Sequence, residues 1–359
     1  YLIRFVVENF LWFFMYRKLS LAAIILGMLI LQSCSSMIYD SAYPALKDGR
    51  YDSEFPYRSS SDQLEKISTT IKLLNCIAFY TSYIFDESAK LTNYDLDNID
   101  YTKKALTLVH SNRTASGTAT VIYSLNNKVV VLSTAHIIDF PDTIISYFQT
   151  PEGKSTNLIQ SISYKTKQTN YIPDFPEGGE LDILAKDSAK DLVLLGKTYT
   201  SEPFNPSVFS YPFGKADDLE WGTFIYVFGY PLNQKMLTKG IVSNPNKERH
   251  TFYVDAVFNK GFSGGIVLAI RDGVPNFELV GLIKSVPGEF EFTLRPEFKP
   301  GEADYSPLIP YQGIVYVDKN QPMRLGVTKV IGAETIIEFI NSYQSIIPAG
   351  IKNDKTESK

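Results

Sequence analysis

The sequence predicts an all-β protein carrying a helix near each end, and three observations support this. From about residue 103 onward, short apolar runs alternate with turn residues, a pattern typical of β-barrels or β-sandwiches rather than of alternating strands and helices. Asn126-Asn127 lies between two such runs, as the turn of a hairpin would. Tyr and Phe, which favour strands, number 23 each among 359 residues.

Each apolar run predicts one strand. The expected strands are Ala105–Val109, Ala119–Tyr123, Val129–Ser133, Leu158–Tyr164, Glu180–Ala185, Leu192–Leu195, Thr223–Phe228, Gly240–Ser243, Thr251–Val257, Gly265–Ile270, Glu278–Lys284 and Gly313–Val317.

Two segments show helical rather than strand periodicity. Residues 61–88 begin with Ser61-Asp62, which offers a helix cap. The apolar residues that then recur at helical spacing are Leu64, Ile67, Ile71, Leu74, Ile77 and Ala78. Residues 333–345 present an apolar face of isoleucine and phenylalanine. We therefore expect helices over 61–88 and 333–345.

The N-terminal residues have the organisation of a signal peptide. The first Met is Met15, and Arg17-Lys18 is followed by the apolar run Leu19–Leu31. That run is shorter than the roughly 20 residues of a membrane-spanning helix, the alternative interpretation. Leu31-Gln32-Ser33-Cys34 resembles the lipobox of bacterial lipoproteins, which implies cleavage before Cys34 and acylation of that residue. We expect a protein of the bacterial cell envelope, lipid-anchored to a membrane on its periplasmic or cell-surface face.

Composition argues against several other classes. The net charge is -4 and basic residues form no block, so no nucleic-acid partner is expected. Two cysteines, Cys34 and Cys76, exclude a disulfide framework. No Cys/His cluster has zinc-ligand spacing, and neither a metal nor a cofactor is expected. Cys76 is interpreted as a small buried residue, with a reactive thiol as the alternative. His110 and His250 are interpreted as structural or surface residues.

Three separated residues together suggest acyl-transfer chemistry. Ser263 lies in Gly261-Phe262-Ser263-Gly264-Gly265, where the N–H groups of Gly261 and Ser263 can converge as an oxyanion hole. His136 follows an apolar strand, and Asp191 precedes one. Taken singly, they have ordinary explanations: a glycine-rich turn, a structural histidine and a solvated strand start. Their order His–Asp–Ser, with spacings of about 55 and about 72 residues, fits a nucleophile, base and orienting carboxylate shared between two lobes.

Several ordered blocks carry a family resemblance. From about 105 to 346 the chain resembles the trypsin-like, chymotrypsin-fold serine proteases, in particular the bacterial high-temperature-requirement branch, here without a peptide-binding module. The blocks that match are Ser116–Ile122, Ser133–His136, Asp191–Leu195, Phe228–Pro231, Lys239–Ser243, Val254–Ala256 and Val280–Ile283.

The resemblance implies two six-stranded antiparallel β-barrels with the active site between them. It implies His136, Asp191 and Ser263 as catalytic residues, and it places the base of the specificity pocket at Val257 and its edge at Gly281. An apolar base favours apolar or small substrate side chains. The chain departs from the family at Phe262, which stands where Asp or Asn is usual, and at Ile266, which replaces Pro.

The expected organisation follows in chain order. It comprises upstream residues and signal peptide (1–33), a lipidated linker (34–60), a helical extension (61–100), a protease domain (101–347) and a disordered tail (348–359). Within the protease domain, lobe one covers about 103–205, lobe two about 206–330 and a C-terminal helix 333–345, and the long Pro-rich segment 286–311 resembles an insertion near the pocket.

The function expected from the residues and the resemblance is a membrane-anchored serine endopeptidase acting on polypeptides. One alternative is a catalytically inactive, protease-like binding or scaffolding lipoprotein, which Phe262 favours. Another is a lipoprotein whose working part is the helix over 61–88, with the barrels as its scaffold.

Overall fold

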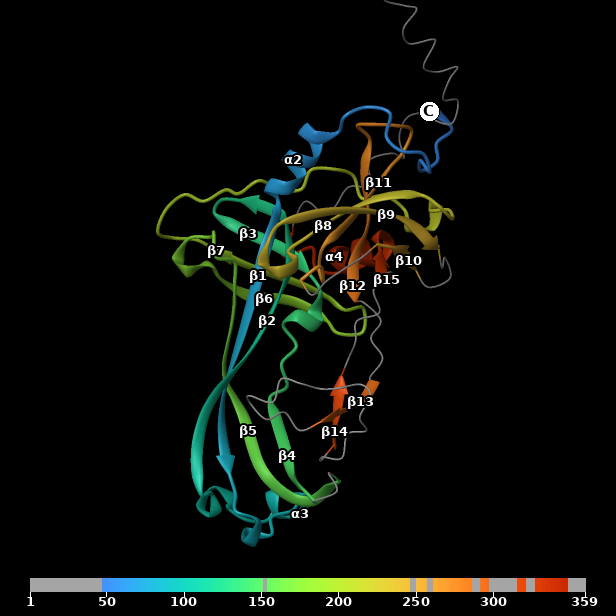
Figure 1. Cartoon of the computed structure of the whole chain (residues 1–359). Helices are drawn as coiled ribbons and strands as arrows, with labels where there is room; N and C mark the ends of the chain where they lie inside the picture. The colour runs from blue at the N-terminus through green and yellow to red at the C-terminus, as the bar shows by residue number, and fades with distance from the viewer. Residues whose placement is uncertain are drawn as a thin grey trace, which may run out of the picture.

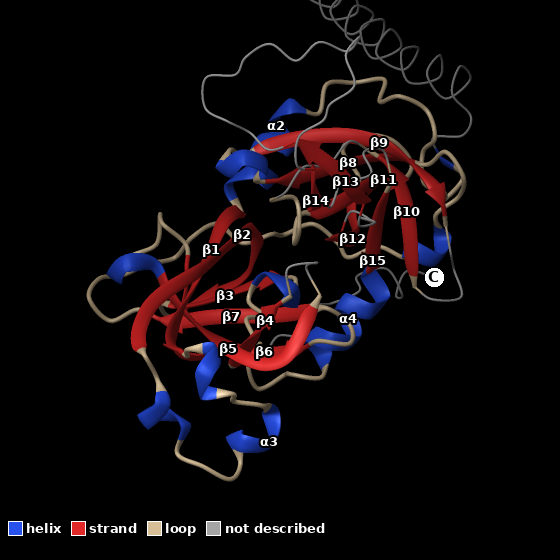
Figure 2. Ribbon diagram, turned by 60° about the horizontal axis from the view of Figure 1, so that its bottom comes forward, coloured by secondary structure: helices blue, strands red, loops and turns tan. Residues whose placement is uncertain are grey.

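The chain folds into two closed antiparallel barrels with a helix after the second (Figures 1 and 2). The computed structural model describes residues 47–150, 154–245, 250–256, 261–285, 291–296, 315–320 and 327–347. The first barrel runs β1-β2-β3-β7-β6-β5, closed by the β1–β5 pairing, with β4 added beside β5. The second runs β10-β15-β12-β11-β8-β9 and closes through β9–β10. The predicted fold class is confirmed.

The elements have the following bounds. The first barrel contains β1 (Ile71–Ile84), β2 (Thr107–Leu125), β3 (Lys128–Ser133), β4 (Thr143–Gln149), β5 (Ser155–Tyr171), β6 (Glu180–Asp187) and β7 (Leu192–Thr198). The second contains β8 (Phe224–Gly229), β9 (Met236–Asn244), β10 (Thr251–Asp255), β11 (Ile266–Ile270), β12 (Phe277–Ser285) and β15 (Thr328–Gly332). A separate hairpin pairs β13 (Glu291–Pro296) with β14 (Val315–Asn320), and the α-helices are α2 (Ser61–Thr69), α3 (Asn93–Leu96) and α4 (Ala333–Asn341).

The prediction of a helix over 61–88 is wrong beyond Thr69. From Leu74 to Ser82 every second residue is buried, which is the period of a strand. Both edges of this strand are paired, one with β2 and the other with β5. The apolar spacing fits either structure, and the two neighbouring strands decide in favour of β. The first barrel therefore begins at Ile71 rather than near residue 103, and the alternative of a working helix over 61–88 loses its basis.

Three strands of the first barrel continue well beyond it. β1, β2 and β5 are 14, 19 and 17 residues long. The strand predicted at Ala119–Tyr123 and all but the first two residues of the one predicted at Ala105–Val109 belong to the single strand β2. In Figure 1 their far ends and β4 extend away from the barrel, with α3 at the tip. A small apolar cluster around Phe85, Leu91, Ile159 and Ile162 stabilises this arm.

Cys76 is fully buried in β1, and burial raises the pKa of its thiol to about 12, as expected of an inert structural cysteine.

Apolar packing joins the two barrels. One continuous cluster includes Leu132 and Leu194 from the first barrel and Phe228 and Leu268 from the second, and it also takes in the apolar face of α4. Such a cluster resists sliding of one barrel on the other, because cores are close-packed.

The helix predicted over 333–345 is confirmed as α4, which ends at Asn341. Within the described ranges, no helix has the length and apolar character needed to cross a membrane.

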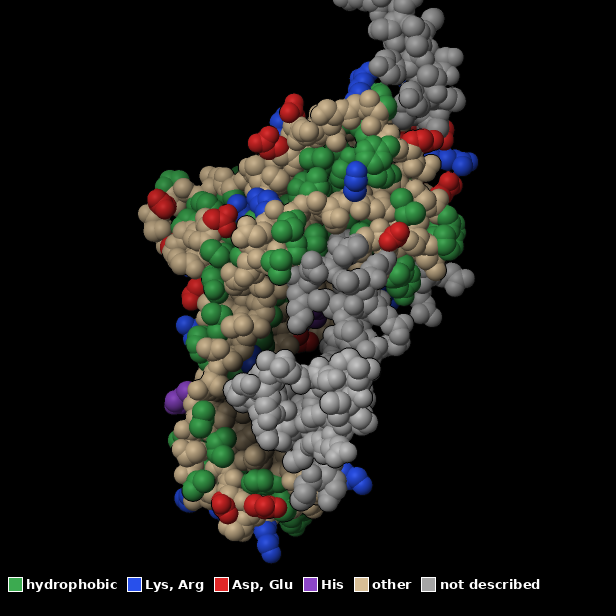
Figure 3. Space-filling model, in the orientation of Figure 1, with side chains coloured by type: hydrophobic (Ala, Val, Ile, Leu, Met, Phe, Trp, Pro, Cys, Tyr) green, Lys and Arg blue, Asp and Glu red, His purple; other side chains and the backbone are tan. Residues whose placement is uncertain are grey.

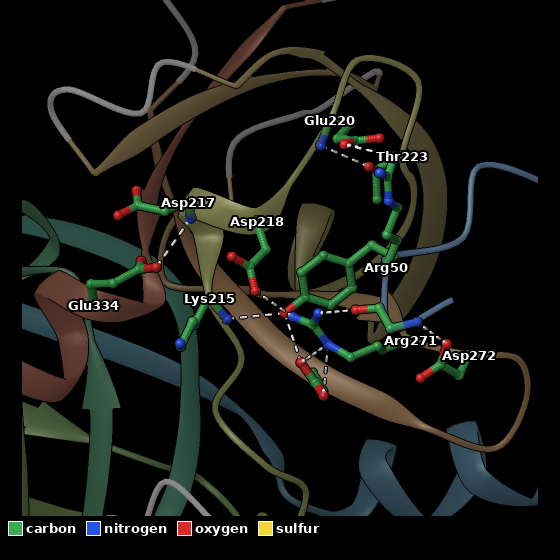
Figure 4. Close-up of polar contacts among 12 residues, drawn as sticks. Arg50, Lys215, Asp217, Asp218, Glu220, Thr223, Arg271, Asp272 and Glu334 are labelled. Carbon is green, nitrogen blue, oxygen red and sulfur yellow. Dashed lines mark hydrogen bonds and ion pairs between the residues drawn. The ribbon is translucent and has the colours of Figure 1, made fainter. Parts of the chain in front are cut away.

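The described part of the expected linker packs on the second barrel. Tyr51 is 6% exposed, and its backbone forms an isolated antiparallel β-bridge with Arg271. The guanidinium carbon of Arg271 lies 3.9 Å from the centre of the tyrosine ring. The Tyr51 hydroxyl donates to Glu278 at 2.7 Å, and Arg271 also pairs with Asp218 (Figure 4).

On the face shown in Figure 3, acidic and basic side chains are scattered rather than gathered by sign.

Asp52, beside Tyr51, makes the packing of this N-terminal segment on the second barrel sensitive to pH. Its carboxylate accepts the Gly273 N–H at 3.1 Å, while burial raises its pKa from 3.8 to about 6. The folded protein then binds a proton more tightly than the unfolded chain, so the stability that this proton supplies is fully present below about pH 4 and is lost as pH rises through 6.

Replacing Asp52 with asparagine is therefore expected to stabilise the protein at pH 7.5. The gain is about 1 kcal/mol, because half-exposure of the group weakens the effect. Urea denaturation of both proteins at pH 4 and pH 7.5 measures this. A gain at pH 4 as large as that at pH 7.5 would contradict the account.

Candidate active site

His136 and Asp191 lie at adjacent ends of two paired strands. β3 ends at Ser133, which pairs with Val193 near the start of β7. His136 follows in a short 3-10 turn (Ala135–Ile137), and Asp191 directly precedes β7. The β3–β7 pairing therefore brings together two residues that are 55 positions apart in sequence.

The hydrogen bonds between His136 and Asp191 fix the orientation of the imidazole. His136 Nδ1 lies 2.9 Å from Asp191 Oδ2 and 3.1 Å from Oδ1, and the His136 N–H donates to Oδ1 at 2.9 Å. Asp191 is 5% exposed, whereas the His136 side chain is 43% exposed. A proton on Nδ1, facing the carboxylate, leaves Nε2 as the acceptor. The pair can therefore take a proton at Nε2 and stabilise the resulting imidazolium.

Thr118 in β2 attaches the serine loop, residues 261–265, to the first barrel. Its N–H donates to the carbonyl of Ser263 at 2.8 Å, and its hydroxyl donates to the carbonyl of Gly261 at 2.7 Å. The same hydroxyl accepts the Tyr230 N–H at 3.0 Å. Thr118 is fully buried, so these bonds are shielded from water. Sequence reasoning placed Thr118 only within a matching block and assigned it no role.

Gly117, beside Thr118, places Ser263 near the turn that carries His136. A Cβ on Gly117 would lie 2.3 Å from Cδ1 of Ile137 and 3.0 Å from the carbonyl oxygen of Ser263. The residue after His136 and the backbone of Ser263 therefore both approach Gly117 closely. Ser263 thus lies on the second barrel and His136 and Asp191 on the first, with Gly117 of β2 between them, and among the described residues no hydrogen bond joins Ser263 to His136.

The loop leaves its predicted oxyanion donors available. Among the described residues, neither the Gly261 N–H nor the Ser263 N–H donates a hydrogen bond. The neighbouring groups are paired, since the Gly264 N–H donates to Ile283 and the Gly265 N–H donates to the carbonyl of Phe262. A loop with its other groups fixed and two donors unpaired has the properties of an anion-binding turn.

Phe262 holds the loop by burial. It is 4% exposed and belongs to the core of the second barrel, with Val254, Val267 and Val280. A Cβ on Gly229 would lie 2.3 Å from Cδ1 of the Phe262 ring, so this ring needs a glycine at position 229. Burying such a side chain contributes roughly 2–3 kcal/mol. An apolar anchor thus stands where the family that the sequence resembles uses a polar one.

The other residues of the site that the sequence singled out lie in the second barrel or outside the described residues. Gly281 lies in β12 opposite Val267, and a Cβ there would lie 2.5 Å from Cγ1 of Val330, so this glycine permits close packing within the second barrel. Ile266 is fully buried in the cluster between the barrels. Val257 and Cys34 lie outside the described residues, as do the predicted signal peptide and the tail.

Part of the chain matches a known protein family. Residues 117–282 match the family described as "Trypsin-like peptidase domain", a range that contains His136, Asp191 and Ser263. No curated protein matches the chain.

Several solved structures are similar, at low identity. The protease Anisep from Arthrobacter nicotinovorans is 14% identical over 61% of this chain and 86% of its own, with a TM-score of 0.31. The thermostable serine protease AL20 from an extremophilic microorganism is 11% identical over 78% and 99%, with a TM-score of 0.33. The inactivated protease paralogue S-D1 of the scabies mite is 11% identical over 76% and 93%, with a TM-score of 0.32. Residues 117–282 are thus similar in sequence to the trypsin-like peptidase domain, and they lie within a fold of two closed barrels.

Proposed function

We propose that this protein is a serine endopeptidase that cleaves polypeptides through an acyl-enzyme on Ser263. The observation that carries the proposal is the buried Asp191 carboxylate bonded to both the ring and the backbone of His136, beside a serine loop fixed to the first barrel by Thr118. That arrangement supports acyl transfer on a trypsin-like peptidase domain.

The proposed reaction uses only groups of this chain and water. Ser263 Oγ attacks the scissile carbonyl while His136 Nε2 accepts its proton. The Gly261 and Ser263 N–H groups stabilise the oxyanion, and Asp191 stabilises the imidazolium. His136 then protonates the leaving amine. Water, deprotonated by His136, hydrolyses the ester and restores the serine. These steps need neither a metal ion nor a cofactor.

Hydrolysis of an unfolded protein by the purified chain tests the proposal. We expect cleavage by the wild type and a loss of at least about 10³-fold in Ser263→Ala, because the nucleophile is gone. Ser59→Ala, an exposed serine bonded to Ser61, is the matched control and should cleave like the wild type. Equal cleavage by Ser263→Ala and the wild type would contradict the proposal.

Phe262 is the observation that favours a second candidate, an inactive protease-like binding protein. An apolar residue beside the serine removes the polar group that usually holds the loop in the related family. Against this candidate, the His136–Asp191 pair is complete and the loop is fixed by other contacts. Labelling of Ser263 by a fluorophosphonate probe would distinguish the two candidates, because only an activated serine reacts.

We further propose that Cys34 anchors the protein to a membrane of the bacterial envelope through attached acyl chains. The support is the basic start, the short apolar run and the lipobox-like ending in the sequence. Cys34→Ala should move the protein from the membrane to the soluble fraction. Retention of this variant in the membrane fraction would contradict the anchor.

A further inference from the structure

Three potential metal ligands converge on the second barrel, away from the residues of the proposed mechanism. They are Asp217 in a 3-10 turn (Ala216–Asp218), His250 just before β10 and Glu334 in the first turn of α4. One ligand atom from each lies within 4.8 Å of the other two. Figure 4 shows Asp217 and Glu334 on neighbouring elements, with the backbone N–H of Asp217 donating a hydrogen bond to the Glu334 carboxylate.

Hydrogen bonds from backbone and side chains hold the three elements together at this point. The Asp217 N–H donates to Glu334 Oε1 at 3.1 Å, and the Gly332 N–H, at the start of α4, donates to the carbonyl of His250 at 2.8 Å. His250 Nδ1 lies 3.2 Å from Asp217 Oδ1. These bonds hold the three chain segments that carry the potential ligands close to one another.

Glu334 gives a second, independent indication of a bound cation. Its Oε2 is buried and has no hydrogen-bond partner among the described residues. A buried carboxylate oxygen without a partner is costly, so natural proteins pair such atoms with a proton donor or a cation. An ion pair between His250 and Asp217 accounts for two of the residues but leaves this oxygen unexplained.

Two nearby cations of the described chain are engaged elsewhere, and a third, Lys215, lines the cavity beside the cluster. Lys190 pairs with Glu338 at 3.1 Å, and Arg271 pairs with Asp218 at 3.0 Å. A cavity of about 410 Å³ adjoins the cluster. Its lining residues are Gly214, Lys215, Asp217, Glu334, Ile337 and Glu338. There is room beside Glu334 for an ion that keeps water ligands.

We propose that Asp217, His250 and Glu334 bind a divalent transition-metal ion, of which Zn²⁺ is the best match. One imidazole nitrogen with two carboxylates suits zinc, whereas Ca²⁺ and Mg²⁺ take all-oxygen sites. Water fills the remaining coordination positions. The bound ion links the start of α4 to the second barrel and stabilises the fold. The site shares no residue with the proposed catalytic group.

Zinc titration of the full, untagged, chelator-treated chain tests this proposal. Calorimetric titration with ZnCl₂ should give one strong site per chain, and saturating zinc should raise Tm by several degrees, because an ion that binds only the folded state stabilises it. MgCl₂ at equal concentration should leave Tm unchanged.

Two substitutions locate the site. Glu334→Gln preserves the shape of the side chain, and His250→Asn alters a half-exposed one. Each should weaken zinc binding at least tenfold. Glu338→Gln, on the same helix and paired with Lys190, is the control and should bind like the wild type. Absence of a strong site in the wild type, or a strong site that persists in both ligand variants, would overturn the proposal. The titration reports on binding even if a variant is less stable.

Discussion

Under the proposed mechanism, Asp191→Asn is expected to lower kcat for peptide hydrolysis by about 10⁴ while leaving the fold intact, the effect that this change has in a well-characterised Ser–His–Asp protease. The Asp191 carboxylate accepts hydrogen bonds from both the ring and the backbone N–H of His136. An amide can present its NH₂ group to Nδ1 instead. Nε2 then carries the ring proton and cannot accept one from Ser263.

The measurement is steady-state hydrolysis of one peptide at several pH values. Asp139→Asn is the matched control, since Asp139 lies close to His136 in sequence but pairs with Lys186. We expect the control to stay within about twofold of the wild type, because half-exposed ion pairs contribute little. Activity of Asp191→Asn within tenfold of the wild type would exclude Asp191 from the proposed role.

Phe262→Ala is expected to destabilise the protein by about 3–5 kcal/mol and to reduce activity further than the loss of folded protein explains. The ring is 4% exposed, and truncation opens a cavity under the serine loop, next to Gly229. Freed of its anchor, the loop no longer holds the Gly261 and Ser263 N–H groups in one orientation. Phe262→Leu fills more of the space and should recover most of both losses.

Chemical denaturation gives the stability change, and kcat under folding conditions gives the functional one. Phe55→Ala is the control for loss of a phenylalanine on this barrel, because Phe55 is 64% exposed where it packs on Phe224. Its cost should stay below about 1 kcal/mol. If the two alanine variants lost equal stability, Phe262 would not be an anchor.

The sequence predicted the parts of the fold that have local signals. Short apolar runs predicted most of the barrel strands, and His136 and Asp191 each adjoin such a run, at β3 and β7. β1 was taken for helix because its apolar spacing is ambiguous, and only its pairing with β2 and β5 decides it. β4 and β15 were not predicted: the apolar residues of β4 come in adjacent pairs rather than in alternation, and β15 contains only two apolar side chains, those of Val330 and Ile331.

Long-range contacts could not be predicted from one sequence. Thr118 matters because its hydroxyl reaches Gly261, 143 positions later. Tyr51 lies in the segment that the sequence predicts to be a linker, and its hydrogen-bond partner Glu278 is 227 positions away. The departure at Phe262 was visible in the sequence, but its burial in the second barrel was not.

Reaction with a fluorophosphonate probe tests the central claim most directly, because such probes phosphonylate a serine that a neighbouring base has activated. Wild-type protein and Ser263→Ala are treated in parallel, and the modified residue is mapped by mass spectrometry. We predict one label per chain, on Ser263, in the wild type and none in the variant. Equal absence of label from both proteins, with both folded, would contradict the claim and favour the inactive binding protein.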